Sequence, residues 1–98
     1  MSLEPVQLLI KVYDFTIVQC KKKDQVKASK GIVELISALN FDHDGVSLGF
    51  FRLYQFCQDK IKKDQFEEAI PILEGLREAW VEAEKKNGKS NGEKKQAQ

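Results

Sequence analysis

KKDQ occupies residues 22–25, and the same tetrapeptide returns at residues 62–65. Each copy lies between two stretches in which apolar residues recur every three or four positions, the period of an amphipathic helix. Lysines suit the negative end of a helix that finishes, and an aspartate is a good N-cap for the helix that follows. The repeat therefore predicts two tight turns, each joining a pair of antiparallel helices.

These turns divide the chain into four predicted helices, at about residues 4–22, 25–39, 46–63 and 65–83. Asp64 and Glu67 have the spacing of a capping box at the start of the fourth helix. Pro71 lies inside that helix and is expected to kink it, whereas Gly31 in the second helix marks a close backbone approach. Two helical hairpins predict an all-α, antiparallel four-helix bundle.

The predicted core consists of the apolar stripes of the four helices. Cys20 and Cys57 fall on these stripes, which predicts two small buried thiols in a reducing cytosol. A disulfide between them requires that the first and third helices touch there. The other core positions are Val6, Leu9, Ile10, Tyr13, Ile17, Ala28, Ile32, Leu35, Ile36, Leu39, Phe50, Leu53, Tyr54, Ile61, Phe66, Ala69, Leu73, Leu76, Trp80 and Ala83.

The distribution of charge divides the chain of 98 residues into one domain, residues 1–86, and a tail, residues 87–98. The tail is lysine-rich and has no apolar period, so we expect it to be disordered. Without it the domain is mildly acidic, which argues against a nucleic-acid partner. No apolar run reaches the length of a membrane span, and no leader peptide is recognisable at the N-terminus, so a cytosolic protein is expected.

The segment 40–51 begins like a calcium-binding loop, with Asp42 and Asp44 at suitable positions. Phe51 stands where the loop needs a bidentate glutamate, so the coordination shell cannot close, and we interpret the segment as a polar turn. His43, the only histidine, has no nucleophile nearby in the sequence. The sequence predicts no metal site, no cofactor and no enzyme activity.

Several large apolar residues fall outside the predicted core stripes. Together they predict a groove that receives a partner's apolar helix or is covered by a second subunit. The lysines of the two KKDQ copies are expected at one end of the bundle, where they either neutralise helix ends or form a docking patch. The surplus apolar residues are Leu8, Val12, Phe15, Val33, Phe51, Phe56, Ile70 and Val81.

Four segments resemble, in the correct order, the helices of the flagellin-specific export chaperones (the FliS family). EPVQLLIKVYDFTI at 4–17 is similar to the family's first helix and KASKGIVELISALN at 27–40 to its second. LYQF at 53–56 is similar to part of its third helix, and KKDQFEEAIPILEGLREAW at 62–80 to its closing hairpin. The chain is shorter than the family around both KKDQ turns, and it lacks the family's N-terminal arm.

This resemblance implies a chaperone in the bacterial cytosol that binds the disordered C-terminal segment of flagellin, prevents premature polymerisation and delivers its client to the export apparatus. A client with a different identity, or a diverged bundle that forms a homodimer and holds no client, are the alternatives. Tyr54 and Trp80 match family positions but fit the core better. The expected client contacts are Leu8, Val12, Phe15, Phe51, Phe56 and Ile70.

Overall fold

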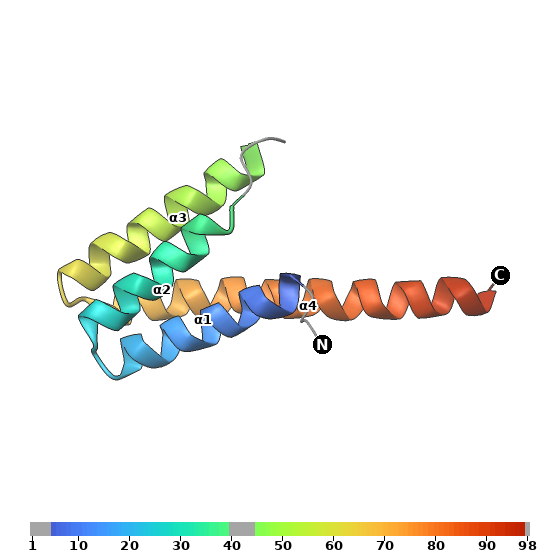
Figure 1. Ribbon diagram of the computed structural model, residues 1–98, viewed down its shortest axis with the longest axis horizontal. Helices are drawn as coiled ribbons and strands as arrows, with labels where there is room; N and C mark the ends of the chain where they lie inside the picture. Colours follow the sequence, from blue (N-terminus) through green and yellow to red (C-terminus); the bar gives the residue numbers. More distant parts are fainter. Residues whose placement is uncertain (1–4, 40–44, 98) are drawn as a thin grey trace.

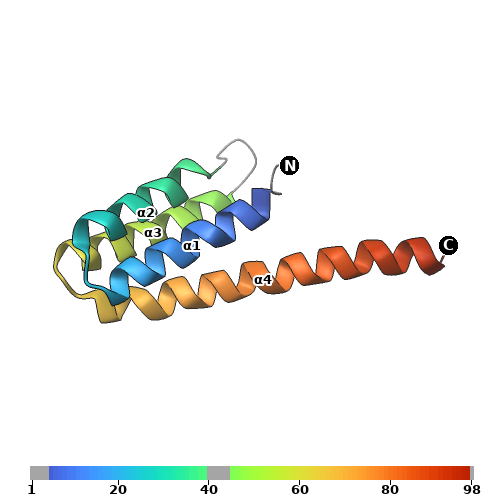
Figure 2. The ribbon, with the colours of Figure 1, turned by 60° about the horizontal axis from the view of Figure 1, so that its bottom comes forward.

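The computed structural model describes residues 5–39 and 45–97, and this part of the chain forms four helices and no strand. The helices are α1 (Pro5–Lys21), α2 (Gln25–Ser37), α3 (Gly45–Lys62) and α4 (Phe66–Ala97). Both α1 and α3 pack against α2 and α4, so α1 and α3 occupy opposite corners of the bundle (Figures 1 and 2). The predicted all-α, antiparallel four-helix bundle is confirmed.

Most of the predicted core is buried. Tyr13, Ile32 and Leu35 are fully enclosed, as are Tyr54 and Leu73. Partly buried residues extend this core, among them Leu9, Ile36, Leu39, Phe50, Leu76 and Trp80. Leu53 is the exception, because its side chain is 40% exposed. Neighbouring residues in a helix point about 100° apart. Leu53 directly precedes the buried Tyr54, so its side chain points away from the core.

The two cysteines are buried free thiols, as the sequence predicted. Burial raises the pKa of Cys20 to about 11 and that of Cys57 to about 12. Both side chains are therefore uncharged at neutral pH and pack as small apolar groups. The Cys57 sulfur lies 4.0 Å from the Ala69 carbonyl oxygen, where α3 approaches α4.

The first KKDQ turn ends α1 with a Schellman motif. Lys23 adopts a left-handed conformation (φ 60°), and its N–H donates to the Cys20 carbonyl at 3.0 Å. The N–H of Asp24 reaches back to the Gln19 carbonyl at 2.9 Å. The Asp24 carboxylate then accepts a hydrogen bond from the N–H of Lys27 at 3.0 Å. Asp24 is thus the N-cap of α2, as predicted.

The second KKDQ turn has the same backbone hydrogen bonds, shifted by one residue in the sequence. Here Asp64 is left-handed (φ 61°), and its N–H donates to the Ile61 carbonyl at 3.0 Å. Gln65 donates to the Lys60 carbonyl at 2.8 Å and directly precedes α4. The predicted capping box of Asp64 with Glu67 is therefore wrong, because Asp64 belongs to the end of α3.

The two turns lie side by side and are bonded together. The side-chain amide of Gln25, the last residue of the first KKDQ, donates to the Lys62 carbonyl at 3.1 Å and to the Asp64 carboxylate at 3.1 Å. The second turn thereby gains a donor for one of the free carbonyls at the end of α3. Both KKDQ turns lie at the same end of the bundle, as predicted (Figure 2).

Gly31 lies where α1 and α2 come closest. A Cβ atom at this position would stand 2.0 Å from Thr16 Oγ1 and 2.9 Å from Thr16 Cβ. Only glycine leaves room for the opposite helix at that distance. The predicted close approach at Gly31 is confirmed.

Two expectations for the fourth helix are wrong. α4 passes through Pro71 without interruption, and Figure 2 shows no sharp bend along it. Pro71 and Glu67 are both exposed, so water can satisfy the carbonyl that loses its hydrogen bond. The helix also continues to Ala97, beyond the ends of the other three helices and across the segment expected to be disordered (Figure 1).

Candidate partner-binding surface

Three large apolar side chains line the outer side of α1. Leu8 is 50% exposed, Phe15 41% and Val18 44%. Their spacing of seven and three residues places them in one row, which we call the α1 stripe. Leu8 and Phe15 belong to the predicted contacts, whereas Val18 was not among them. Extending the spacing of Leu8 and Phe15 by one turn would have found it.

Polar contacts fix the orientation of the α1 stripe. Asp14 forms an ion pair with Arg77 of α4, and Lys21 Nζ lies 3.2 Å from a carboxylate oxygen of Glu74. The Asp14 carboxylate raises the pKa of Arg77, which keeps the guanidinium charged. With α4 bonded on one side and Gly31 of α2 packed on the other, the α1 stripe faces outward.

Phe56 belongs to a second row with the same spacing, on α3. It is 43% exposed, and the ammonium of Lys60 lies 5.1 Å from the centre of its ring. Val46, 60% exposed, and Leu53 stand ten and three residues before it. We call these three residues the α3 stripe. Neither Val46 nor Leu53 was predicted as a surface residue, and Leu53 was predicted to lie in the core.

The other three predicted contacts are half-buried. Val12 of α1 and Ile70 of α4 pack against the core, so their apolar surface is largely used within the bundle. Phe51 lines a cleft between α2 and α3, together with Ile36 and Gln58. The six predicted contacts therefore do not form one groove. Those that are exposed divide between two stripes at opposite corners of the bundle.

Within the described side chains, no three His, Cys, Asp or Glu residues come close enough together to hold a metal ion. His43, Asp42 and Asp44 lie outside the described residues, so the interpretation of that segment as a polar turn stays a prediction. None of the described helices combines the length and the apolar character that crossing a bilayer requires.

The chain matches no protein-family profile, no curated protein and no solved structure. The likeness of its four segments to the flagellin export chaperones therefore remains a resemblance, carried by the order and spacing of those segments. The four helices occur in that same order, and two apolar stripes lie on their outer surface.

Proposed function

We propose that this protein is an export chaperone of the bacterial cytosol. Its client is the disordered C-terminal segment of flagellin or of a related export substrate, which it keeps from polymerising until the export apparatus receives it. The resemblance of the four segments supports the identity of the client. The observation that carries the proposal is the α1 stripe, in which Leu8, Phe15 and Val18 remain 41–50% exposed although the same helix buries Tyr13 and Cys20.

The size of the stripes indicates how a client binds. Full burial of one large apolar side chain contributes about 1.5–3 kcal/mol, and these side chains are already about half covered. One stripe of three residues thus yields about 3 kcal/mol, and the two stripes together about 6 kcal/mol. A micromolar complex needs about 8 kcal/mol after the costs of association. Even the two stripes together fall short of this value, so we infer that the client contacts both stripes and further parts of the bundle.

A client that contacts both stripes must pass around the bundle, because α1 and α3 lie at opposite corners. A folded partner presents one face, whereas a disordered segment can wrap and form helices where it meets apolar residues. Each stripe spans eleven residues, or about 15 Å of helix, which suits two or three turns of a client helix. The arrangement favours a long, initially unfolded client.

Titration of the protein with a C-terminal flagellin peptide tests the proposal, with heat and helicity as the two signals. We expect micromolar or tighter binding, a gain of helix and a negative heat-capacity change. Phe15→Ala and Phe56→Ala, on different stripes, should each weaken binding by about tenfold. Val26→Ala is the matched control, because Val26 is 76% exposed but lies on neither stripe. Failure of the peptide to bind a well-folded monomer would refute the proposal.

Self-association is the second candidate, and one observation favours it. Apart from its chain neighbours and the backbone of its own helix, nothing lies within 4 Å of a Cβ added at Gly49, which stands between Val46 and Leu53, so the surface beside the α3 stripe is open at this residue. Sedimentation distinguishes the two candidates. A tight dimer that Leu53→Ser converts to monomer, together with no affinity for the peptide, would favour a self-associating bundle. If the client is a different secreted protein, that protein should bind although the flagellin peptide does not.

A further inference from the structure

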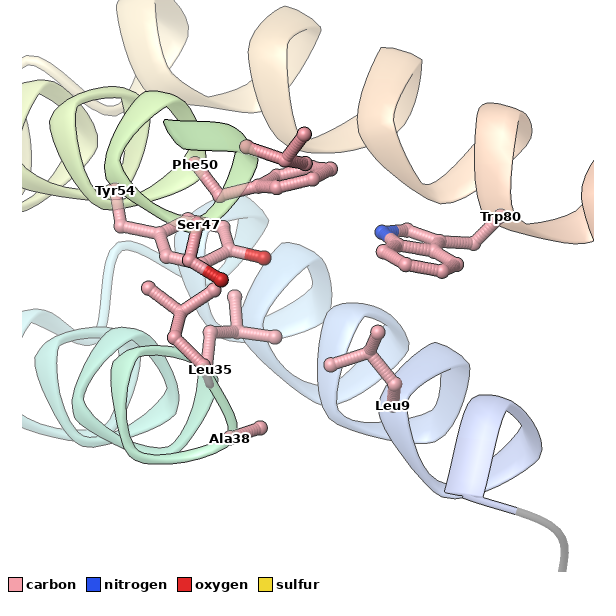
Figure 3. A pocket seen from close by; sticks show the side chains of 9 residues that line it. Leu9, Leu35, Ala38, Ser47, Phe50, Tyr54 and Trp80 are labelled. Atoms are coloured by element: carbon pink, nitrogen blue, oxygen red, sulfur yellow. The ribbon is translucent and has the colours of Figure 1, made fainter. Parts of the chain in front are cut away.

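A pocket of about 210 Å³ opens at the end of the bundle opposite the KKDQ turns. All four helices border it, with Leu9 from α1, Ala38 directly after α2, Phe50 and Tyr54 from α3, and Trp80 from α4 (Figure 3). Phe50 stacks on Trp80 with ring centres 5.6 Å apart. The remaining lining residues are Leu35, Leu39, Val46 and Ser47.

Three hydrogen-bond donors lie in or behind the wall of the pocket, namely the hydroxyls of Tyr13 and Tyr54 and the indole N–H of Trp80. The hydroxyls of Tyr13 and Tyr54 lie 2.5 Å apart, and both side chains are at least 99% buried. One hydroxyl donates to the other, so one hydroxyl hydrogen stays unused. The buried Nε1–H of Trp80 also has no partner among the described residues. In Figure 3 the indole nitrogen points toward Phe50 and Tyr54.

A rearrangement within this cluster does not remove the surplus. The Trp80 indole is close enough to Tyr13 to lower the pKa of that hydroxyl, although burial raises it more strongly. If Trp80 donated to Tyr13 and Tyr13 to Tyr54, the Tyr54 hydrogen would find no acceptor on Tyr13 or Trp80. Burial also raises the pKa of Tyr54, so its hydroxyl keeps this hydrogen. A buried donor without an acceptor is costly, and an incoming oxygen atom would relieve that cost.

Size and charge define the ligand that fits. An apolar cavity of about 150 Å³ holds a benzene molecule, so about 210 Å³ holds a ring with a small substituent. Among the described residues that line the pocket there is no lysine, arginine or histidine, so they offer no counter-charge to a carboxylate. We propose that the pocket binds an uncharged small molecule of about ten non-hydrogen atoms, with an apolar body and one carbonyl oxygen that accepts a hydrogen bond from Tyr54 or Trp80.

Two probes of nearly equal shape test this proposal without any client. Acetophenone carries a carbonyl oxygen, and cumene replaces that oxygen by a methyl group. Trp80 is the only tryptophan, so its indole N–H gives a single signal in a nitrogen–proton NMR spectrum. We expect acetophenone to move this signal saturably and to bind about fivefold more tightly than cumene, the effect of one net hydrogen bond.

Variants identify which side chain donates the hydrogen bond to acetophenone. Tyr54→Phe and Trp80→Phe each remove one donor that borders the pocket, and their double variant removes both. With affinities measured from the ligand's own proton signals, the preference for acetophenone should fall in at least one single variant and disappear in the double variant. Val26→Ala, which lies on neither stripe and does not line the pocket, should keep this preference. The dispersion of the backbone signals reports whether each variant is folded.

Equal affinity of the two probes for the unmodified protein would overturn the proposal, since a bound water would then satisfy the donors. Absence of any saturable shift of the Trp80 signal would also overturn it. Ala38→Phe should fill the mouth of the pocket and abolish binding of both probes. If binding persisted in a folded Ala38→Phe variant, the probes would be bound elsewhere and the assignment of the site would be wrong.

Discussion

Replacement of Gly31 by alanine should destabilise the bundle, although alanine is the better helix former by about 1 kcal/mol. The new Cβ would lie 2.0 Å from Thr16 Oγ1 and 2.9 Å from Thr16 Cβ. Rotation of the threonine cannot relieve the second contact, because Cβ does not move when χ1 changes. Thr16 Oγ1 also donates to the Val12 carbonyl at 2.7 Å, which further limits its movement.

The helices must therefore move apart, and overpacking of this kind costs about 1–3 kcal/mol. The 2.0 Å contact places Gly31→Ala at the upper end of that range. After subtraction of the gain in helix propensity, we expect a loss of about 2 kcal/mol in the free energy of unfolding. For a domain of this size, the melting temperature should fall by on the order of 10 °C.

Urea unfolding followed by circular dichroism measures this loss as a lower midpoint at an unchanged slope. Gly75→Ala is the matched control, because no atom lies within 4 Å of a Cβ added to Gly75, which is also a helical glycine. That variant should gain about 0.5–1 kcal/mol. Equal or greater stability of Gly31→Ala, or an equal loss in Gly75→Ala, would refute the packing explanation.

Three further predictions concern the turns and the thiols. Lys23→Gly should raise the free energy of unfolding by about 1 kcal/mol because Lys23 is left-handed, whereas Lys22→Gly should lower it; the same urea assay compares them. Gln25→Leu should lower the free energy of unfolding by about 1 kcal/mol, since it removes both hydrogen bonds to the second turn. A urea midpoint equal to that of the unmodified protein would contradict this. The folded-state pKa values of Cys20 and Cys57, about 11 and 12, exceed their ordinary 9.0, so the stability they contribute is complete below pH 9 and lost as the pH rises toward 12. Between pH 8 and pH 11, the free energy of unfolding of Cys57→Ala should decline less steeply than that of the unmodified protein. An identical decline would show that the thiols are not responsible for it.

The sequence was sufficient to predict the bundle because its signals are local. Apolar periodicity determines which side of each helix is buried, and Asp24 marks where α2 begins. The error at Asp64 arose because a short polar residue is equally suited to an N-cap and to a left-handed helix end. The hydrogen bonds around it distinguish these roles, and one of them, the bond from Gln25, joins residues 39 positions apart.

The candidate surface was harder to predict than the fold. Leu8, Phe15 and Phe56 were correctly expected to be exposed, because they lie opposite the buried stripes. Val12 and Ile70 lie at the edge of those stripes, where the position of the neighbouring helix decides burial, and a single sequence does not contain that distance. The division of the contacts between two corners follows from which helices are neighbours.

The bonding of the two KKDQ turns has a consequence for the motion of the molecule. At that end, Gln25 ties the first hairpin to the second. Towards the opposite end, the Tyr13–Tyr54 hydrogen bond joins the two hairpins, and the pocket opens between the helices. Amide hydrogens near residues 20–28 and 57–66 should exchange with deuterated water far more slowly than those near Leu9 and Phe50. The helices would then separate mainly at the end that holds the pocket, and a small ligand would enter the pocket during that opening.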